Sequence, residues 1–211
     1  MKTKFLHIAT ALLFAGFTSS CSDFLDRYPL DELSDSSFWK TENDAMMAVT
    51  DIYGCLPTWD QDEDINSDNA VHGIKWAAGN ISKGIYDPMD QSWAGSYTPI
   101  RQCNLVLEKV KDIEMSDESR KKIEGQAYFF RAFVYFNLIR SFGDVPYIDK
   151  PLNLTDVEDI TRTPREEVYA KVMADFDKAI EYLPEEWDAA NTPRVTKGAA
   201  LAMKARAALY Y

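Results

Sequence analysis

Aromatic, amide and acidic side chains are mixed in the stretch from Pro57 to about Asp90, which shows no helical or strand period. Aromatic rings stack on the C–H faces of sugars, and carboxylates and amides bind sugar hydroxyl groups. The combination predicts a sugar-binding surface on one long irregular segment. The candidate ligand-binding residues are Asp68, Asn69, Trp76, Asn80 and Tyr86, with Trp59 and Trp93 as weaker candidates.

The same side chains also have ordinary structural interpretations, which stay open. Trp93 stands at a helical spacing from the apolar residues that follow it, which favours a place in the core. Trp76 is explained as well by packing as by binding. The acidic run from Asp60 to Asp68 is by default a solvated loop. The residue types therefore name candidates without assigning them.

Metal, phosphate and catalytic sites find little support in the sequence. Asp60, Asp62 and Asp64 imitate the start of a calcium-binding loop, but the glycine and glutamate that such a loop needs further on are absent. His72 is the only histidine beyond the first 20 residues, which excludes a multi-histidine zinc site and disfavours a serine–histidine–aspartate triad. Acidic pairs such as Glu185–Glu186 mean little in a chain with 34 acidic residues. No glycine-rich phosphate loop occurs, and we expect no cofactor.

The first 20 residues have the layout of a secretory signal peptide. Lys2 and Lys4 precede the apolar run Phe5–Phe17, and small residues lead to Cys21. A membrane span needs about 20 apolar residues, so this run is too short to remain as an anchor. A short buried helix is the less favoured interpretation. Cleavage before Cys21 would expose an N-terminal cysteine, and we expect acylation of Cys21 to tether the remaining chain to a membrane.

Charge and cysteine content limit the partners of the chain. Removal of residues 1–20 takes away two lysines, so the net charge changes from −11 to −13. Such acidity argues against nucleic acid and against binding to anionic lipid by charge. Cys55 and Cys103 remain besides Cys21; two buried free thiols are favoured over a disulfide, which an exported protein also permits.

Apolar spacing predicts an all-α chain. Thr41 and Asp44 resemble a capping pair for the first helix, and Pro99 inside the second implies a kink or a fresh helix start. Thr163 is predicted to cap the fourth helix, with Pro164 in its first position. Ser116 is predicted to cap the third helix and Gly143 to end it, and an extended connector is expected over 144–162. The predicted helices cover residues 41–56, 93–110, 116–143, 163–183 and 196–211.

The third helix and the last helix share the pattern A-x-x-x-R-A-x-x-Y-[FY]. It begins at Ala127 in one copy and at Ala202 in the other. The offset is about twice a tetratricopeptide period plus an insertion, which predicts helical hairpins stacked in a small right-handed array. Chance similarity between two helices rich in alanine and tyrosine is the alternative.

Motifs along nearly the whole chain resemble the SusD/RagB-type outer-membrane lipoproteins of Bacteroidetes. The segment that ends in F-G-D-V-P is the most specific, and Thr18 departs from the leucine usual in lipoprotein signals. The matching segments are CSDFLD (21–26), SFWKT (37–41), WAGSYTPIRQCNLVLE (93–108), EGQAYFFRAFVYFNLIRSFGDVP (124–146), RTPREEVY (162–169) and RVTKGAALAMKAR (194–206).

The resemblance implies a lipoprotein signal over 1–20 and a tetratricopeptide-like helical domain over 21–211. It implies a surface lipoprotein that is not an enzyme, captures glycan and works with a SusC-like TonB-dependent transporter of the outer membrane. Family members are typically over twice this length. The chain is therefore expected to be the first half of such a scaffold, without the later segments that complete the glycan site and the calcium site of some members.

Two further functions stay open. A helical array of this kind is also suited to docking a protein or peptide without binding sugar. A secreted hydrolase is the third possibility, and turnover of glycan by the pure chain would favour it.

Overall fold

A computed structural model describes residues 38–57, 93–156 and 159–211. The five α-helices of these residues belong to the unit Trp39–Tyr211. Their order is α3 (Glu42–Ile52), α4 (Trp93–Lys109), α5 (Asp117–Phe142), α6 (Arg165–Tyr182) and α7 (Lys197–Ala208). Among the described residues, no helix has the length and apolar character needed to cross a membrane.

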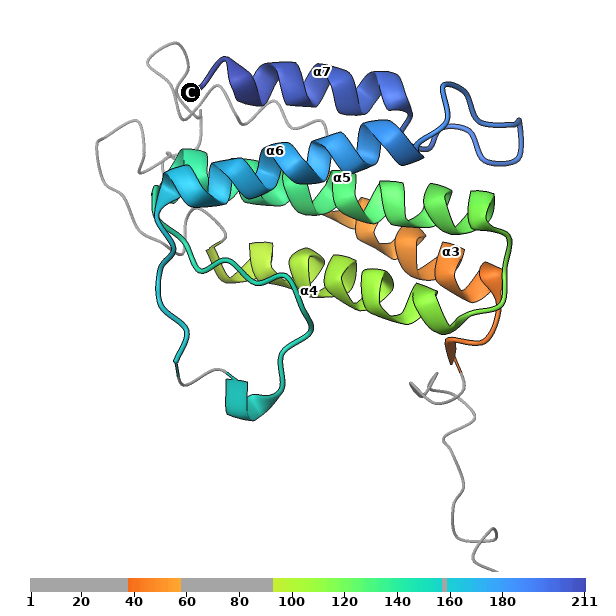
Figure 1. Cartoon of the computed structure of the whole chain (residues 1–211), viewed down its shortest axis with the longest axis horizontal. Helices are drawn as coiled ribbons and strands as arrows, with labels where there is room; N and C mark the ends of the chain where they lie inside the picture. Colours follow the sequence, from red (N-terminus) through yellow and green to blue (C-terminus); the bar gives the residue numbers. More distant parts are fainter. Residues whose placement is uncertain (1–37, 58–92, 157–158) are drawn as a thin grey trace, which may run out of the picture. The chain divides into compact units, whose positions relative to one another are not determined.

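Helix α5 lies at the centre of this unit. It packs against α3 and α4 on one side and against α6 and α7 on the other (Figure 1). The aromatic sequence of α5 explains its position, because a helix that is apolar on most sides needs neighbours on most sides. Tyr135, Phe130 and Phe136 on α5 are among the largest fully buried side chains.

Local capping sets the ends of α3 and α5 as the sequence predicts. The Thr41 hydroxyl accepts from the Asp44 N–H (3.2 Å), and the Asp44 carboxylate accepts from the Thr41 N–H (2.8 Å). Ser116 caps α5, and Gly143 ends it with a φ of 71°, a conformation that favours glycine. These signals act over three or four residues, so the sequence alone reveals them.

The predicted start of α6 is wrong by one residue, because the helix begins at Arg165. Pro164 has an extended backbone and stands before the helix, and the N-cap has no side-chain hydrogen bond. Thr163 does not cap α6 because its backbone N–H and C=O pair with those of Val145 in an antiparallel bridge. The backbone N–H of Arg165 is instead bound by the Asp144 carboxylate at 2.9 Å.

Three smaller predictions also need correction. Helix α4 continues through Pro99, which excludes the fresh helix start and leaves the kink as the remaining expectation there. Helix α3 ends at Ile52 and does not run to residue 56, because the tighter 3₁₀ turn Tyr53–Cys55 follows it. Helix α7 ends at Ala208 and does not run to Tyr211.

Candidate functional site

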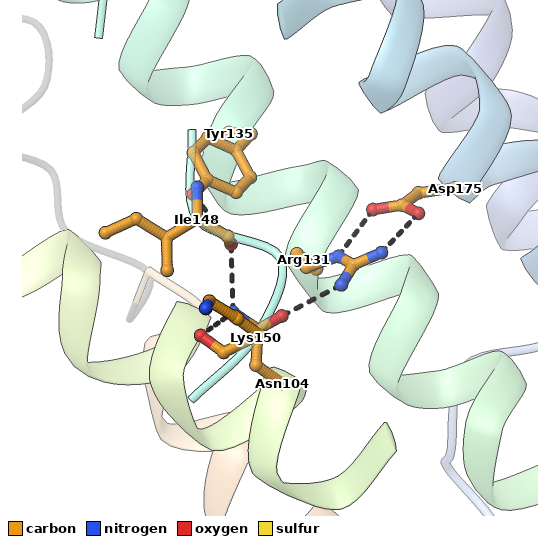
Figure 2. A network of polar contacts seen from close by, with 6 residues as sticks. All are labelled: Asn104, Arg131, Tyr135, Ile148, Lys150 and Asp175. Carbon is orange, nitrogen blue, oxygen red and sulfur yellow. Dashed lines mark hydrogen bonds and ion pairs between the residues drawn. The ribbon is translucent and has the colours of Figure 1, made fainter. Parts of the chain in front are cut away.

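A buried polar network joins the three helices α4, α5 and α6 (Figure 2). Arg131 Nε and Nη2 donate to the two carboxylate oxygens of Asp175, each at 2.7 Å. Arg131 Nη1 donates to Asn104 Oδ1 at 2.8 Å. The guanidinium fork therefore binds the carboxylate with two of its nitrogens and an amide with the third.

The electrostatics of this network favour a charged pair. Burial acts to lower the pKa of Arg131, but the hydrogen bonds and the charge of Asp175 outweigh it and raise that pKa. Burial raises the pKa of Asp175, and the Arg131 guanidinium opposes the shift. An arginine stays protonated in proteins, so the buried carboxylate has a permanent cation beside it.

The same network fixes the extended connector that follows α5. Asn104 Nδ2 donates to the carbonyl oxygens of Ile148 (2.9 Å) and Lys150 (3.4 Å). The Tyr135 hydroxyl donates to the Ile148 carbonyl at 3.1 Å and accepts from the Ile148 N–H at 2.7 Å. The Tyr97 hydroxyl donates to the Pro146 carbonyl at 3.1 Å. These bonds satisfy backbone groups that no sheet or helix pairs.

Trp93 begins α4 and lies half-buried beside the end of α5. Its ring meets Phe142 edge-on, with 4.8 Å between ring centroids, and the Arg162 guanidinium lies 5.1 Å from the centre of the indole. Both contacts are made within the chain, which agrees with the interpretation of Trp93 as a packing residue.

A cavity of about 480 Å³ opens between α3, α4 and α5. This volume falls within the range of small-molecule sites, which is roughly 300–1,000 Å³. The lining includes side chains from α3 and the 3₁₀ turn after it, and pairs one turn apart on α4 and on α5, where residues i and i+4 share a helix face. Asp51 comes from α3 and Cys55 from the turn, and the two helical pairs are Thr98 with Gln102 and Phe133 with Asn137.

The lining of this cavity combines polar groups with one aromatic ring. The carboxylate of Asp51 accepts from Gln102 Nε2. Cys55 is half-buried, and burial raises the pKa of its thiol to about 11, so it is neutral at ordinary pH. The free acceptor of the Gln102 amide, the Asn137 amide and the Thr98 hydroxyl can bind hydroxyl groups, while Phe133 offers an apolar wall.

The sequence-predicted site residues lie outside the described residues. They are Cys21, Asp68, Asn69, Trp76, Asn80 and Tyr86, together with the weaker candidate Trp59. The described chain stops at Pro57 and resumes at Trp93. Gly54 and Cys55, just before this gap, and Gly95 and Ser96, just after it, line the cavity. Both attachment points of the predicted ligand segment are therefore close in sequence to residues of the cavity wall.

Sequence reasoning missed the buried pair and the cavity residues. Arg131 stands alone among aromatic residues of α5, and Asp175 interrupts the apolar stripe of α6 next to Phe176. Each anomaly is a sequence signal for a buried ion pair, because an isolated buried charge is costly. The cavity residues carry no such signal. Among the described residues, no cluster of histidine, cysteine or acidic side chains is suited to a metal ion, and Cys55 and Cys103 are free thiols.

Alignments with relatives in sequence cover most of this chain but less than half of each relative. A SusD-like protein of Formosa agariphila is 30% identical over 199 residues, which are 87% of this chain and 38% of the relative. A SusD-like protein of Bacteroides ovatus is 26% identical and is matched over 89% of this chain and 36% of its own length. The chain thus spans well under half of the curated relatives it matches.

Solved structures show the same arrangement of helices. A SusD-like protein of Bacteroides fragilis superposes with a TM-score of 0.72 and 28% identity, over 87% of this chain and 38% of the other. A SusD-like carbohydrate-binding protein of the same organism gives a TM-score of 0.68 and 25% identity, over 82% and 38%. The predicted all-α, tetratricopeptide-like fold is confirmed by these matches. The model of the SusD-like family described as starch-binding and associating with the outer membrane matches residues 23–209, and the chain therefore belongs to that family.

Proposed function

We propose that the protein is a surface-exposed lipoprotein of the outer membrane that binds oligosaccharide and delivers it to a SusC-like TonB-dependent transporter. The family match over residues 23–209 carries this proposal, because the family is described as starch-binding and outer-membrane-associated. The similar structure from Bacteroides fragilis that is named as carbohydrate-binding adds support. The role is capture and transfer without catalysis.

Attachment to the membrane is assigned to Cys21 after removal of residues 1–20. Two or more acyl chains on this cysteine would hold the helical unit at the membrane, since a single chain binds only marginally. The test is to compare wild type with Cys21→Ala in cell fractionation, with Cys55→Ala as a matched cysteine control. Release of Cys21→Ala alone, with loss of the lipid mass, supports the assignment. A Cys21→Ala protein that stays in the membrane fraction contradicts it.

Glycan binding is tested with the purified full chain and a panel of oligosaccharides, by calorimetry and by quenching of tryptophan fluorescence. Binding of a glycan, with no change in the length of that glycan during incubation, is the expected result. Hydrolysis of any oligosaccharide by the pure chain would contradict the non-enzymatic role. Transfer is tested by co-purification of a TonB-dependent transporter from the native membrane, with an unrelated outer-membrane protein as the control.

A protein-binding or peptide-binding role is the second candidate, and one observation favours it. Leu201 and Leu209 on and beside α7 are 49% and 88% exposed, and with Tyr210 at 54% they offer apolar surface that a protein partner could cover. If the Leu201→Glu variant still co-purifies with a transporter and the wild-type protein binds glycan, the first candidate is favoured. Loss of the transporter in that variant, with no glycan bound by wild type, would favour the second.

A further inference from the structure

The cavity between α3, α4 and α5 has a lining that is polar but carries little charge. Among the described residues that line it, Asp51 is the one acidic side chain, and burial raises the pKa of the Cys55 thiol to about 11. The remaining polar groups are the amides of Gln102 and Asn137 and the hydroxyls of Ser96 and Thr98. No lysine, arginine or histidine is among the described residues that line it.

Two of these polar groups are already oriented. Gln102 Nε2 donates to the Asp51 carboxylate, so the Gln102 carbonyl oxygen is left to accept from a ligand. The Asp51 carboxylate has further lone pairs that can accept hydrogen bonds from donor groups of a ligand, such as hydroxyls. On the opposite wall, Phe133 and Asn137 stand one turn apart on α5 and are both half-buried. An apolar ring beside an amide suits a ligand with a C–H face and hydroxyl edges.

We propose that this cavity binds an uncharged sugar residue and discriminates against uronic and sulfated sugars. The inference rests on the proposed function, glycan binding, and adds the residues and the ligand class. Asp51, Gln102 and Asn137 bind hydroxyl groups, and Phe133 covers the apolar face of the ring. An anionic sugar would place its charge beside the Asp51 carboxylate, and the described lining offers no cation to offset the repulsion between the two like charges.

The specificity of the site gives the sharpest experiment. Affinities of the full chain are measured by calorimetry for neutral oligosaccharides and for their acidic counterparts, for example galactan oligomers against oligogalacturonate of the same length. Neutral glycan is expected to bind at least about tenfold more tightly than its acidic counterpart. Asp51→Asn is expected to narrow this ratio several-fold, because the substitution removes the charge and keeps the shape.

The location of the site is tested with two substitutions that shorten a side chain to alanine. Gln102→Ala on α4 and Asn137→Ala on α5 are each expected to weaken binding of the neutral glycan about tenfold, the effect of losing one well-placed hydrogen bond to a ligand. Glu108→Ala, an exposed position on α4 away from the cavity, is the matched control and should bind as wild type does. Circular dichroism confirms folding, and Gln102→Ala carries the test if Asn137→Ala does not fold.

The outcomes separate the inference from the function it rests on. If the wild-type chain binds neutral glycan and both Gln102→Ala and Asn137→Ala bind it with the same affinity, the cavity is not the binding site. Glycan binding by the protein would then still stand. Equal or tighter binding of the acidic oligomers overturns the ligand class. A wild-type chain that binds nothing on the panel overturns both the proposed function and this inference.

Discussion

Arg131 on α5 and Asp175 on α6 form a two-point ion pair inside the helical unit. Both nitrogen–oxygen distances are 2.7 Å, and the two side chains are only 8% and 9% exposed. A buried pair of this kind contributes less to net stability than its geometry suggests, because both charges were removed from water. Removal of only one partner is strongly destabilising, because the remaining charge would stay buried and unpaired.

Removal of one partner is therefore expected to be far more harmful than removal of both. Asp175→Leu should lower the free energy of unfolding by about 3–5 kcal/mol, whereas Arg131→Met with Asp175→Leu should recover part of that loss. Urea denaturation measures both. Lys178→Ala, which breaks the exposed pair with Glu181, is the control and should cost under about 1 kcal/mol. A double variant less stable than Asp175→Leu would contradict this account.

The hydroxyl of Tyr135 is expected to hold the connector in place. Tyr135→Phe keeps the ring but leaves the Ile148 N–H without its acceptor at 2.7 Å. We expect a loss of about 1–3 kcal/mol and faster hydrogen exchange at the Ile148 amide. Tyr169→Phe is the control, because the stacking of Tyr169 on Tyr211 does not need its hydroxyl. Unchanged exchange at Ile148 would show that the connector is held by other contacts.

Asp144 is expected to act as the cap of α6 although it is distant from that helix in sequence. Its carboxylate accepts from the Arg165 N–H and places negative charge at the helix N-terminus. Asp144→Ala should cost about 1 kcal/mol in thermal or urea unfolding. Thr163→Val, which removes the hydroxyl and keeps the side-chain shape, should change stability much less, because the backbone bridge to Val145 is retained. The reverse order of effects would restore Thr163 as the cap.

Gly125 is expected to be required where α5 meets the end of α6. A Cβ atom at this position would lie 3.0 Å from Tyr182 Cβ and 3.1 Å from Leu183 Cγ. Gly125→Ala should therefore destabilise the protein by about 1–3 kcal/mol through overpacking. Gly54→Ala is the matched control, since no heavy atom lies within 4 Å of the added group. Equal stability of the two variants would indicate that α6 shifts freely.

Alkylation of Cys55 is expected to depend steeply on pH. Burial raises the pKa of this thiol to about 11, and the thiolate is the reactive form. The native rate at about pH 8 should be slow and should rise roughly tenfold per pH unit until the pH reaches that pKa. Peptide mapping after iodoacetamide treatment follows the reaction, and the urea-unfolded chain is the fast control. Equal native and unfolded rates at neutral pH would contradict the burial.

The parts of the fold that follow from local chemistry were predictable from the sequence. The capping box of Thr41 and Asp44, the Ser116 cap and the Gly143 stop each involve residues within a few positions of one another. The start of α6 was not predictable in this way, because Thr163 pairs with Val145 and no local sequence pattern indicates that bridge.

The candidate site divides in the same way. The aromatic and polar residues of the segment from Pro57 to Asp90 are visible as composition, and their role remains a prediction. The cavity wall is built from three helices, and on each helix alone its polar residues resemble an ordinary solvated face. Gln102 and Asn137 become neighbours of Asp51 only when α3, α4 and α5 pack. The grouping of these three side chains around one cavity is therefore a property of the tertiary structure.

The bridge between Val145 and Thr163 has a consequence for how this connector can vary in length. The two N–H to C=O bonds, 3.2 and 3.0 Å, join the chain just after α5 to the chain just before α6. Asn104 and Tyr135 hold the connector as far as Lys150. Extra residues inserted between Pro151 and Arg162 would therefore extend a loop whose ends are already fastened. Doubling such a loop adds only about 0.6 kcal/mol of closure entropy. This segment is the place where the scaffold accepts new sequence without disturbing its helices.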